Sequence, residues 1–443
     1  MSLSTFSGLQ VALRGLMAQQ MALDTTGHNI ANANTLGYSR QTVDMTTMPA
    51  LTLPSISGNN GNGVQLGMGV DVTQIQRVRD SFLDIQYRSE NMQYGDSSAR
   101  ADALGQAELA FDEPSETGVN QLLSNFYDAW SAVQHAPNDP SARTTLIRAA
   151  GTLASAFASV SDQLTRTATD AQEQYDAITG PSGDVESMAK QLAQLNTAIS
   201  HATAVGQAPN DLLDQRDELL DRLSGLAQVS VTQNRDGTDT VDFGGVTLVD
   251  PRAANGYTWP QTLTNPGGQL GALQALASPT GPAMTYKGRL DGVVAELVRN
   301  VNDIYSRADG RNFFDPAGTT ADALAVIATD ANLVTGTDTT SAGSDDIATA
   351  IAALRGGQVD RNYASLVAEV GSDVKDSDNQ QRIQLSLLDS IEQRRLSVQG
   401  VATDEEMTNL IQFQRGYQAS ARVMTTLDSM LDTLINRTGT TGL

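Results

Sequence analysis

The stretch FSGLQVALRGLMAQQMALDTTGHNI, residues 6–30, decides the fold. Its apolar side chains recur every three or four residues, but Gln20 and Gly27 stand where this spacing predicts apolar residues. The apolar positions are Phe6, Leu9, Leu13, Leu16, Leu23 and Ile30. A heptad stripe with two gaps predicts an amphipathic helix that pairs through a weak seam.

The other end of the chain carries a similar stripe. Its positions are Met407, Leu410, Tyr417, Ala421, Met424, Leu427, Leu431 and Leu434. Thr403 and Glu406 have the spacing of a capping box, and acidic residues between them suit the positive end of a helix dipole. We therefore interpret these acids as a helix start and not as a catalytic cluster. The two end helices are expected to pair as a coiled coil inside a larger assembly.

Further helical patterns lie between the two ends. The longest runs from Leu146 to Ile178 and stops before Gly180-Pro181. Shorter ones cover 119–133, 185–199, 212–226 and 290–304. With 40% hydrophobic but only 5% aromatic residues, the composition also fits helix packing. These patterns predict an elongated helical bundle.

Two segments break the helical pattern. Alternating valines and a turn at Arg235-Asp236-Gly237 predict a small β-rich insertion from Val229 to Pro282. Residues 311–343 are rich in Gly, Thr, Asp and Ala, and predict irregular structure.

We therefore expect a mainly α, elongated, multidomain protein with a small β-rich insertion. Residues 1–75 would hold the N-terminal axial helix and an extended segment, and would pair with the C-terminal axial helix at 404–443. A helical bundle at 76–228 would be completed by 284–403. The β-rich outer insertion would span 229–283.

Charge and composition exclude several classes of function. The 443 residues include 28 Lys and Arg against 51 Asp and Glu, and the net charge of −23 argues against nucleic acid or an anionic membrane as partner. Without cysteine, the chain has no disulfide, thiolate nucleophile or Cys-based metal site. The N-terminus lacks a basic leader, and no apolar run reaches the ~18 residues of a membrane span. We expect neither a cleaved signal peptide nor membrane insertion.

No motif in the sequence predicts a catalytic, cofactor or metal site. The glycine-rich run at 58–63 matches neither phosphate-binding pattern and is interpreted as a loop. His28, His135 and His201 are far apart in sequence, and none has a partner at metal-ligand spacing. The Asp236-Gly237 pair with Asp239 lacks the spacing of a calcium loop and is better explained by a hairpin turn. An enzyme is the least favoured class.

Residues 211–220, DLLDQRDELL, are dense in charge. Their leucines fall on one helical face and their acids and arginines mostly on the other. We favour a solvent-facing helix surface over a docking site for these charges.

The block Asn29-Ile30-Ala31-Asn32-Ala33-Asn34-Thr35-Leu36-Gly37-Tyr38-Ser39-Arg40-Gln41 resembles the N-terminal signature of bacterial flagellar axial proteins. Asn, Thr and Gly are poor helix formers, so this block should end the helix and turn the chain outward. Resemblance is greatest to the flagellar hook-associated protein 1 family. It extends to Gly61-Asn62-Gly63-Val64, Arg79-Asp80-Ser81-Phe82, residues 211–223 and blocks between Gly400 and Leu434.

This resemblance implies a structural subunit of the extracellular flagellum, at the junction between hook and filament. It implies export by the flagellar type III system and assembly as a ring at the hook tip, with the end-helix residues packing between subunits. Implied partners are further copies of the chain, the hook protein, a second junction protein on the filament side and an export chaperone at the C-terminal helix. The gapped seam further predicts that both ends are disordered in the free monomer.

Two alternatives stay open. A hook or rod subunit is disfavoured because those proteins resemble mainly β-domains between paired ends, whereas residues 119–226 predict helices. An adhesin-like role could be carried by the β insertion. That insertion is smaller than in better-known family members, so their outermost domain is expected to be reduced here.

Overall fold

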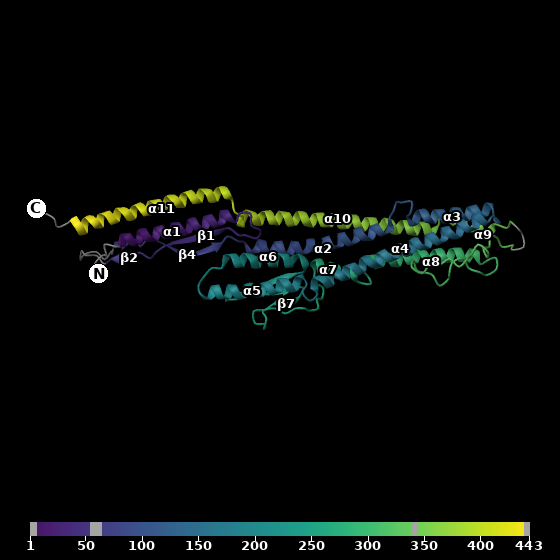
Figure 1. Ribbon diagram of the computed structural model, residues 1–443, viewed down its shortest axis with the longest axis horizontal. Helices are drawn as coiled ribbons and strands as arrows, with labels where there is room; N and C mark the ends of the chain where they lie inside the picture. Colours follow the sequence, from purple (N-terminus) through teal and green to yellow (C-terminus); the bar gives the residue numbers. More distant parts are fainter. Residues whose placement is uncertain (1–6, 54–63, 339–342, 438–443) are drawn as a thin grey trace.

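The computed structural model describes residues 7–53, 64–338 and 343–437. It is an elongated, mainly helical molecule (Figure 1). The helices are α1 Ser7–Ala31, α2 Ser81–Phe111, α3 Val119–His135, α4 Pro140–Thr179, α5 Asp184–Ala204, α6 Asn210–Leu226, α7 Gly268–Ala277, α8 Pro282–Tyr305, α9 Asp346–Ala352, α10 Gln358–Gln399 and α11 Thr403–Asp432. A π-helical turn, Thr433–Arg437, follows α11. The expected fold class is confirmed.

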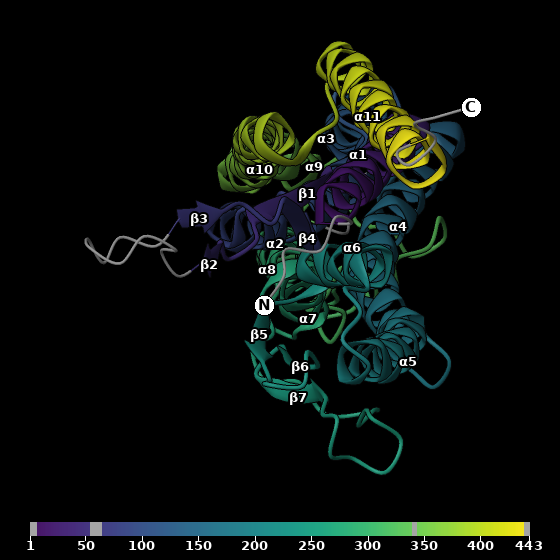
Figure 2. The same ribbon diagram turned by 90° about the vertical axis from the view of Figure 1, so that its left-hand side faces the viewer.

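The strands are short and lie in three small antiparallel sheets. They are β1 Gln41–Thr47, β2 Leu51–Leu53, β3 Val64–Leu66, β4 Val70–Arg77, β5 Val229–Gln233, β6 Asp239–Phe243 and β7 Val246–Val249. β1 pairs with β4, β2 with β3, and β5, β6 and β7 form a meander. Viewed along the long axis, β2 and β3 project from the helices on one side (Figure 2). The β5–β7 sheet projects on another side.

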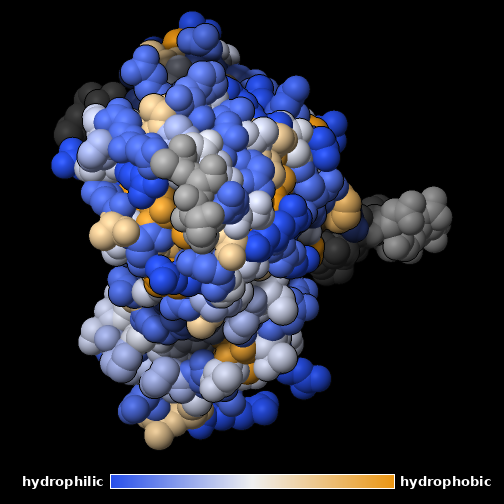
Figure 3. All heavy atoms as spheres, turned by 90° about the vertical axis from the view of Figure 1, so that its right-hand side faces the viewer, coloured by the Kyte–Doolittle hydropathy of each residue, from blue (hydrophilic) through white to orange (hydrophobic). Residues whose placement is uncertain are grey.

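One hydrophobic core fills the end of the body farthest from the termini. It lies between α3, α4, α8, α9 and the first half of α10. Trp130, Phe126 and Phe313 pack there with ring centroids 5.2 to 6.4 Å apart, which suits edge-to-face aromatic contacts. The surface over this end is mostly hydrophilic (Figure 3). The segment after α8, expected to be irregular, contributes Phe313 and Phe314 to this core.

A second core lies under the β5–β7 sheet, where Phe243 packs with Trp259 and with leucines of α5 and α6. The hairpin turn predicted at Arg235-Asp236-Gly237 joins β5 to β6, and Gly237 supplies the positive φ of 81° that the turn needs. The segment expected to be β-rich is strand only as far as Val249. Its last part is α7, whose leucines and alanines pack against α2 and α4.

α1 and α11 lie side by side and antiparallel at the other end of the molecule (Figure 1). Gly8 faces Leu427, Gly15 faces Ser420 and Gln19 faces Gly416. The residue number rises along α1 by as much as it falls along α11, as expected for an antiparallel pair in constant register. A β-carbon on Gly416 would lie 2.7 Å from Oε1 of Gln19, so glycine allows the close approach. The β1–β4 ribbon covers another side of α1. Among the described residues, no helix is long and apolar enough to cross a membrane.

Candidate functional site at the joint between the end helices and the body

The block at 29–41 lies where the end helices meet the body. α1 ends at Ala31, a turn follows, and β1 begins at Gln41, as the sequence predicts. Asn29 is buried, and its side-chain amide donates to the carbonyl oxygen of Gln41 at 2.9 Å and accepts from the Gln41 N–H at 2.9 Å. These two bonds fix the direction in which the chain leaves α1.

The same asparagine connects the block to α11. Asn29 Nδ2 donates to Glu406 Oε2 at 3.1 Å, and the Tyr38 hydroxyl donates to Asn29 Oδ1 at 2.8 Å. Glu406 is only 3% exposed, so its carboxylate depends on this partner. Burial raises the pKa of Tyr38, and the carboxylates of Asp211, Asp214 and Glu406 raise it further. Tyr38 is therefore a hydrogen-bond donor at physiological pH.

The predicted capping box is wrong. α11 begins at Thr403, one residue earlier than expected, and Ala402 occupies the cap position without a side-chain cap bond. Thr403 is already inside the helix, and the carboxylate of Glu406 turns toward Asn29. A bond between two helices has replaced the local one.

The second half of the block holds α6 and α10. Ser39 donates from its N–H and its hydroxyl to the two carboxylate oxygens of Asp214, at 2.9 and 2.8 Å. Gln41 Nε2 donates to Asp211 Oδ1 at 3.0 Å, and the Arg40 N–H donates to the carbonyl of Gln399 at 2.8 Å. Gly37 has a φ of 76°, which the tight turn before Tyr38 requires.

The remaining block residues shape the turn. Asn32 donates to the carbonyl of His28 at 3.0 Å, and Thr35 donates to the side chain of Asn32 at 3.2 Å. Ala31 and Asn34 are exposed. The block as a whole joins α1, β1, α6, α10 and α11, and we call this meeting point the joint.

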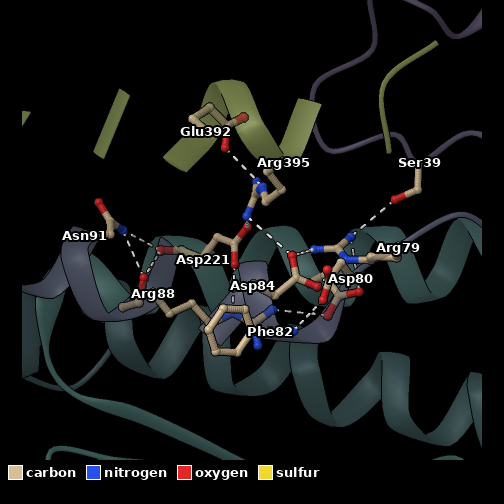
Figure 4. Close-up of polar contacts among 12 residues, drawn as sticks. Ser39, Arg79, Asp80, Phe82, Asp84, Arg88, Asn91, Asp221, Glu392 and Arg395 are labelled. Carbon is tan, nitrogen blue, oxygen red and sulfur yellow. Dashed lines mark hydrogen bonds and ion pairs between the residues drawn. The ribbon is translucent and has the colours of Figure 1, made fainter. Parts of the chain in front are cut away.

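An arginine–aspartate cluster lies at the centre of the joint, and Figure 4 labels Arg79, Asp84, Arg88, Asp221 and Arg395 from it. It consists of Arg77, Arg79, Arg88, Arg395, Asp84, Asp214, Asp217 and Asp221. Each of these side chains is at most 15% exposed. Four arginines face four aspartates, and a fifth acid, Glu392, lies 3.0 Å from Arg395.

The arginines come from β4, the loop after it, α2 and α10, and they meet aspartates of α6 and α2. Arg79 binds both carboxylate oxygens of Asp84, at 2.7 and 3.0 Å, and Arg77 lies 2.7 Å from Asp214. On Asp221, Arg88 and Arg395 take one oxygen each, at 2.7 and 2.6 Å. Bidentate and shared contacts of this kind fix both distance and orientation. α2, α6 and α10 are thereby held in one arrangement.

Asp217 is the most heavily shared carboxylate of the cluster. It lies 2.9 Å from Arg77, 3.3 Å from Arg79 and 3.2 Å from Arg88. Burial alone would raise the pKa of Asp217, but these three guanidinium groups outweigh it and hold the pKa below its ordinary value. The pKa of Arg79 is also raised, because its carboxylate partners outweigh its own desolvation.

We expect acid to loosen the joint. Since the pKa of Asp217 is lower in the folded state than in the unfolded one, its stabilisation is complete above the unfolded value of about 3.9. It is lost as the pH falls through the folded pKa. Urea midpoints measured from pH 7 down to 3 should fall below about pH 4, and by less in an Asp217→Asn chain. A midpoint that does not change over this range would contradict the prediction.

The solvent-facing interpretation of residues 211–220 is wrong. Asp214, Arg216 and Asp221 are buried, and Arg216 lies 3.0 Å from Asp239 under the β5–β7 sheet. The polar face of α6 is covered by α2, β4 and the 29–41 block. Acids at positions 214, 217 and 221 share one helical face, and this stripe is the signal in the sequence that could have revealed the cluster.

The predicted end-helix residues are mostly half-buried on α1 and α11, and Leu427 faces Gly8. The half-buried ones are Leu9, Leu16, Leu23, Ile30, Leu410, Tyr417, Ala421, Met424, Leu427 and Leu431. Leu13 and Met407 are exposed, at 40% and 51%. Phe6, the side chain of Leu434 and the glycine-rich run at 58–63 lie outside the described residues. Packing of these positions between subunits stays a prediction.

Family models match both ends and the middle of the chain. Residues 9–38 match the model described as flagella basal body rod protein, and 392–437 match flagellar basal body rod FlgEFG protein C-terminal. Residues 104–311 match the flagellar hook-associated protein FlgK helical domain. Paired ends of this kind around a helical body define an axial structural protein of the bacterial flagellum.

Flagellar hook-associated protein 1 of Bacillus subtilis is 30% identical, and the alignment covers 99% of each chain. Its counterpart in Salmonella typhimurium is 34% identical over 62% of this chain and 46% of its own length. The structure of the flagellar hook junction protein FlgK from Burkholderia pseudomallei has 27% identity and a TM-score of 0.42, covering 51% of this chain and 44% of that one. The chain belongs to the flagellar hook-associated protein 1 family. It is a structural protein of the external flagellum and not an enzyme.

Proposed function

We propose that the chain assembles as a ring of copies at the hook tip and adapts the hook to the filament. Its neighbours would be the hook protein on one side and a second junction protein on the other, with an export chaperone on α11 before secretion. The axial part would be residues 1–75 with 404–443. The body would be 76–228 with 284–403, and 229–283 the outer insertion.

One observation carries the proposal: the α1–α11 pair leaves apolar side chains uncovered along its length. Leu13, Met17 and Met21 lie one turn apart on α1 and are 40 to 52% exposed. On α11 the uncovered side chains are Met407, Ile411, Val423 and Met430. Uncovered apolar side chains on both helices mark a protein–protein contact, and neighbouring copies in an axial assembly would cover them.

The joint gives the pair a defined direction relative to the body. Asn29, Tyr38 and Glu406 tie α11 to the turn, and Ser39 ties the turn to Asp214. An adaptor needs this stiffness because its two ends must fit two different polymers. The arginine–aspartate cluster supplies it without a large apolar core.

The location can be tested directly because the chain contains no cysteine. Val205 is 73% exposed on the turn after α5, so a Val205→Cys chain can carry a maleimide dye. In intact flagella the label should form one spot at the boundary between hook and filament. Label spread along the hook or the filament would overturn the proposal.

We further propose that the end helices become ordered on assembly. In α11 only Glu406 is buried among the described side chains, and isolated helices are marginal in water. Hydrogen exchange of the free chain should be fast in residues 7–31 and 404–432 and slow in α3, α4 and α8. Strong protection of both end helices in the monomer would contradict this expectation.

A further inference from the structure

Charge is unevenly distributed along the chain. Residues 1–23 contain Arg14 and no acid, and residues 407–427 contain Arg415 and Arg422 and no acid. Residues 7–23 lie in α1 and 407–427 in α11, so the charged side chains of the α1–α11 pair are all positive over this length. The body between the two ends carries most of the 51 acids. The end helices and the body therefore differ in the sign of their charge.

Arg415 is an exposed side chain of α11 without a partner of its own. No hydrogen bond or ion pair joins its guanidinium to a residue in the described part of the chain. Ile411 precedes it by one turn on the same face and is 47% exposed. Arg422 has no such neighbour, because Gln418 precedes it by one turn. Arg415 and Ile411 together present a cation beside an apolar side chain.

A hollow of about 450 Å³ lies at the joint. Leu36 and Leu396, which are 79 and 52% exposed, line it together with Glu218 and Glu392. Gln399 also lines it, is only 3% exposed, and has an amide oxygen without a hydrogen-bond partner among the described residues. A buried acceptor without a donor is costly, so the hollow suits a ligand that brings N–H groups.

One carboxylate of the hollow has no arginine to itself. The arginines that line the hollow are each bound to another acid: Arg79 to Asp84, Arg222 to Glu218, and Arg395 to Asp221. Glu392 lies 3.0 Å from Arg395 but shares it with Asp221, which lies at 2.6 Å (Figure 4). Burial and the carboxylates of Asp221 and Asp84 raise the pKa of Glu392, although Arg395 lowers it. Glu392 is therefore the acid with which a further cation would pair.

We propose that the Arg415 guanidinium of one copy enters this hollow in a second copy and pairs with Glu392. A guanidinium has five N–H donors in a fixed plane, enough for this carboxylate and for the amide oxygen of Gln399. Ile411 would then lie against Leu36 at the rim. Arg415 lies about 18 Å along α11 from the first residue of that helix, so it cannot reach the hollow of its own copy.

The charge pattern favours a shifted neighbour. A net charge of −23 opposes contact between two acidic bodies, but it does not oppose contact between the positive α1–α11 pair and an acidic joint. The guanidinium and its hollow are different surfaces of one chain, so the contact is head-to-tail and can repeat around an axis. This inference rests on the proposed ring. It adds that neighbours in the ring are offset by roughly 18 Å along the rod.

Charge reversal and rescue test the ion pair. Arg415→Glu should lower the amount of chain in purified flagella about tenfold, and Arg422→Glu should incorporate at close to the parent level. Adding Glu392→Arg to Arg415→Glu should restore incorporation, whereas a loss caused by poor export would not be rescued. Equal losses in the two single variants would reject the contact. So would a double variant that matches the parent chain in circular dichroism but incorporates no better than Arg415→Glu.

Cysteine pairs in the otherwise cysteine-free chain provide a second readout. A full-length chain with Ile411→Cys and Leu36→Cys, assembled into flagella and mildly oxidised, should run as a ladder of multimers on a non-reducing gel. Each single variant should stay monomeric. The matched pair of Val423→Cys with Leu36→Cys should also stay monomeric, because Val423 is 51% exposed but lies three turns further along α11.

Monomers from the Ile411 pair in assembled flagella, or equal ladders from the Val423 pair, would overturn the proposed contact. The outcome is separate from that of the proposed function. If the ladder is absent while the label on Val205→Cys stays at the boundary between hook and filament, this contact fails and the junction role stands. If the label spreads along the hook or filament, the junction role fails whatever the gel shows.

Discussion

Replacing Asp217 by asparagine lowers the free energy of unfolding by about 3–5 kcal/mol, the cost of breaking a buried ion pair. Three arginines lie within 3.3 Å of this carboxylate, and the amide leaves them facing one negative charge fewer. Asparagine keeps the size of the side chain, so the decrease in the free energy of unfolding is due to the lost charge and not to altered packing. Urea unfolding followed by circular dichroism measures it, and hydrogen exchange of residues 77–91 shows whether the loss is centred on the joint.

Glu218→Gln is the matched control for that experiment. Glu218 is the next residue of α6, but its partner Arg222 is 61% exposed. Exposed pairs contribute at most about 1 kcal/mol, so this variant should unfold close to the parent chain. Equal losses in the two variants would mean that the cluster has no special role in the joint.

Leu16→Asp is expected to abolish incorporation into flagella and to leave the body folded. Leu16 is half-buried on α1, which packs against α11, and we expect a carboxylate there to weaken the α1–α11 contact and to charge the surface offered to other copies. The main core lies at the other end of the molecule, so the thermal unfolding of the monomer should be nearly unchanged. Motility and the amount of chain in purified flagella measure the effect.

Gln10→Asp controls for the added charge on the same helix. Gln10 is exposed and outside the predicted stripe, so its variant should assemble at close to the parent level. Loss of assembly in both variants would show that any new negative charge on α1 blocks incorporation. Normal assembly of Leu16→Asp would show that the apolar stripe of α1 is not needed for incorporation into flagella.

Periodicity predicted α1, α3, α4, α5, α6, α8 and α11 because each of these helices has a clear apolar face. It did not identify α2 or α10 as long helices. Asp84, Gln384 and Arg395 are buried in them, while Phe82 and Leu387 are exposed, so their amphipathic pattern is weak or reversed. A prediction based on apolar faces fails where buried ion pairs and polar contacts replace an apolar core.

The sequence of the 29–41 block predicted where the joint lies but not which contacts hold it. Its residue types predict a helix end and a turn, and both are present. They cannot predict that Ser39 meets Asp214 or that Asn29 meets Glu406, because those contacts depend on how distant elements pack. The same long-range bond explains why the capping box failed, since a buried partner outcompeted the local backbone for the Glu406 carboxylate.

The bond between Asn29 and Glu406 joins residues 377 positions apart. Closing so large a loop costs entropy that only the completed neighbourhood can offset, and contacts of high sequence separation form late in folding. Glu406 leaves a ribosome long after Asn29. The joint is therefore complete only when both of these distant segments are present, and a chain truncated before Glu406 would retain its body while lacking a fixed axial arm.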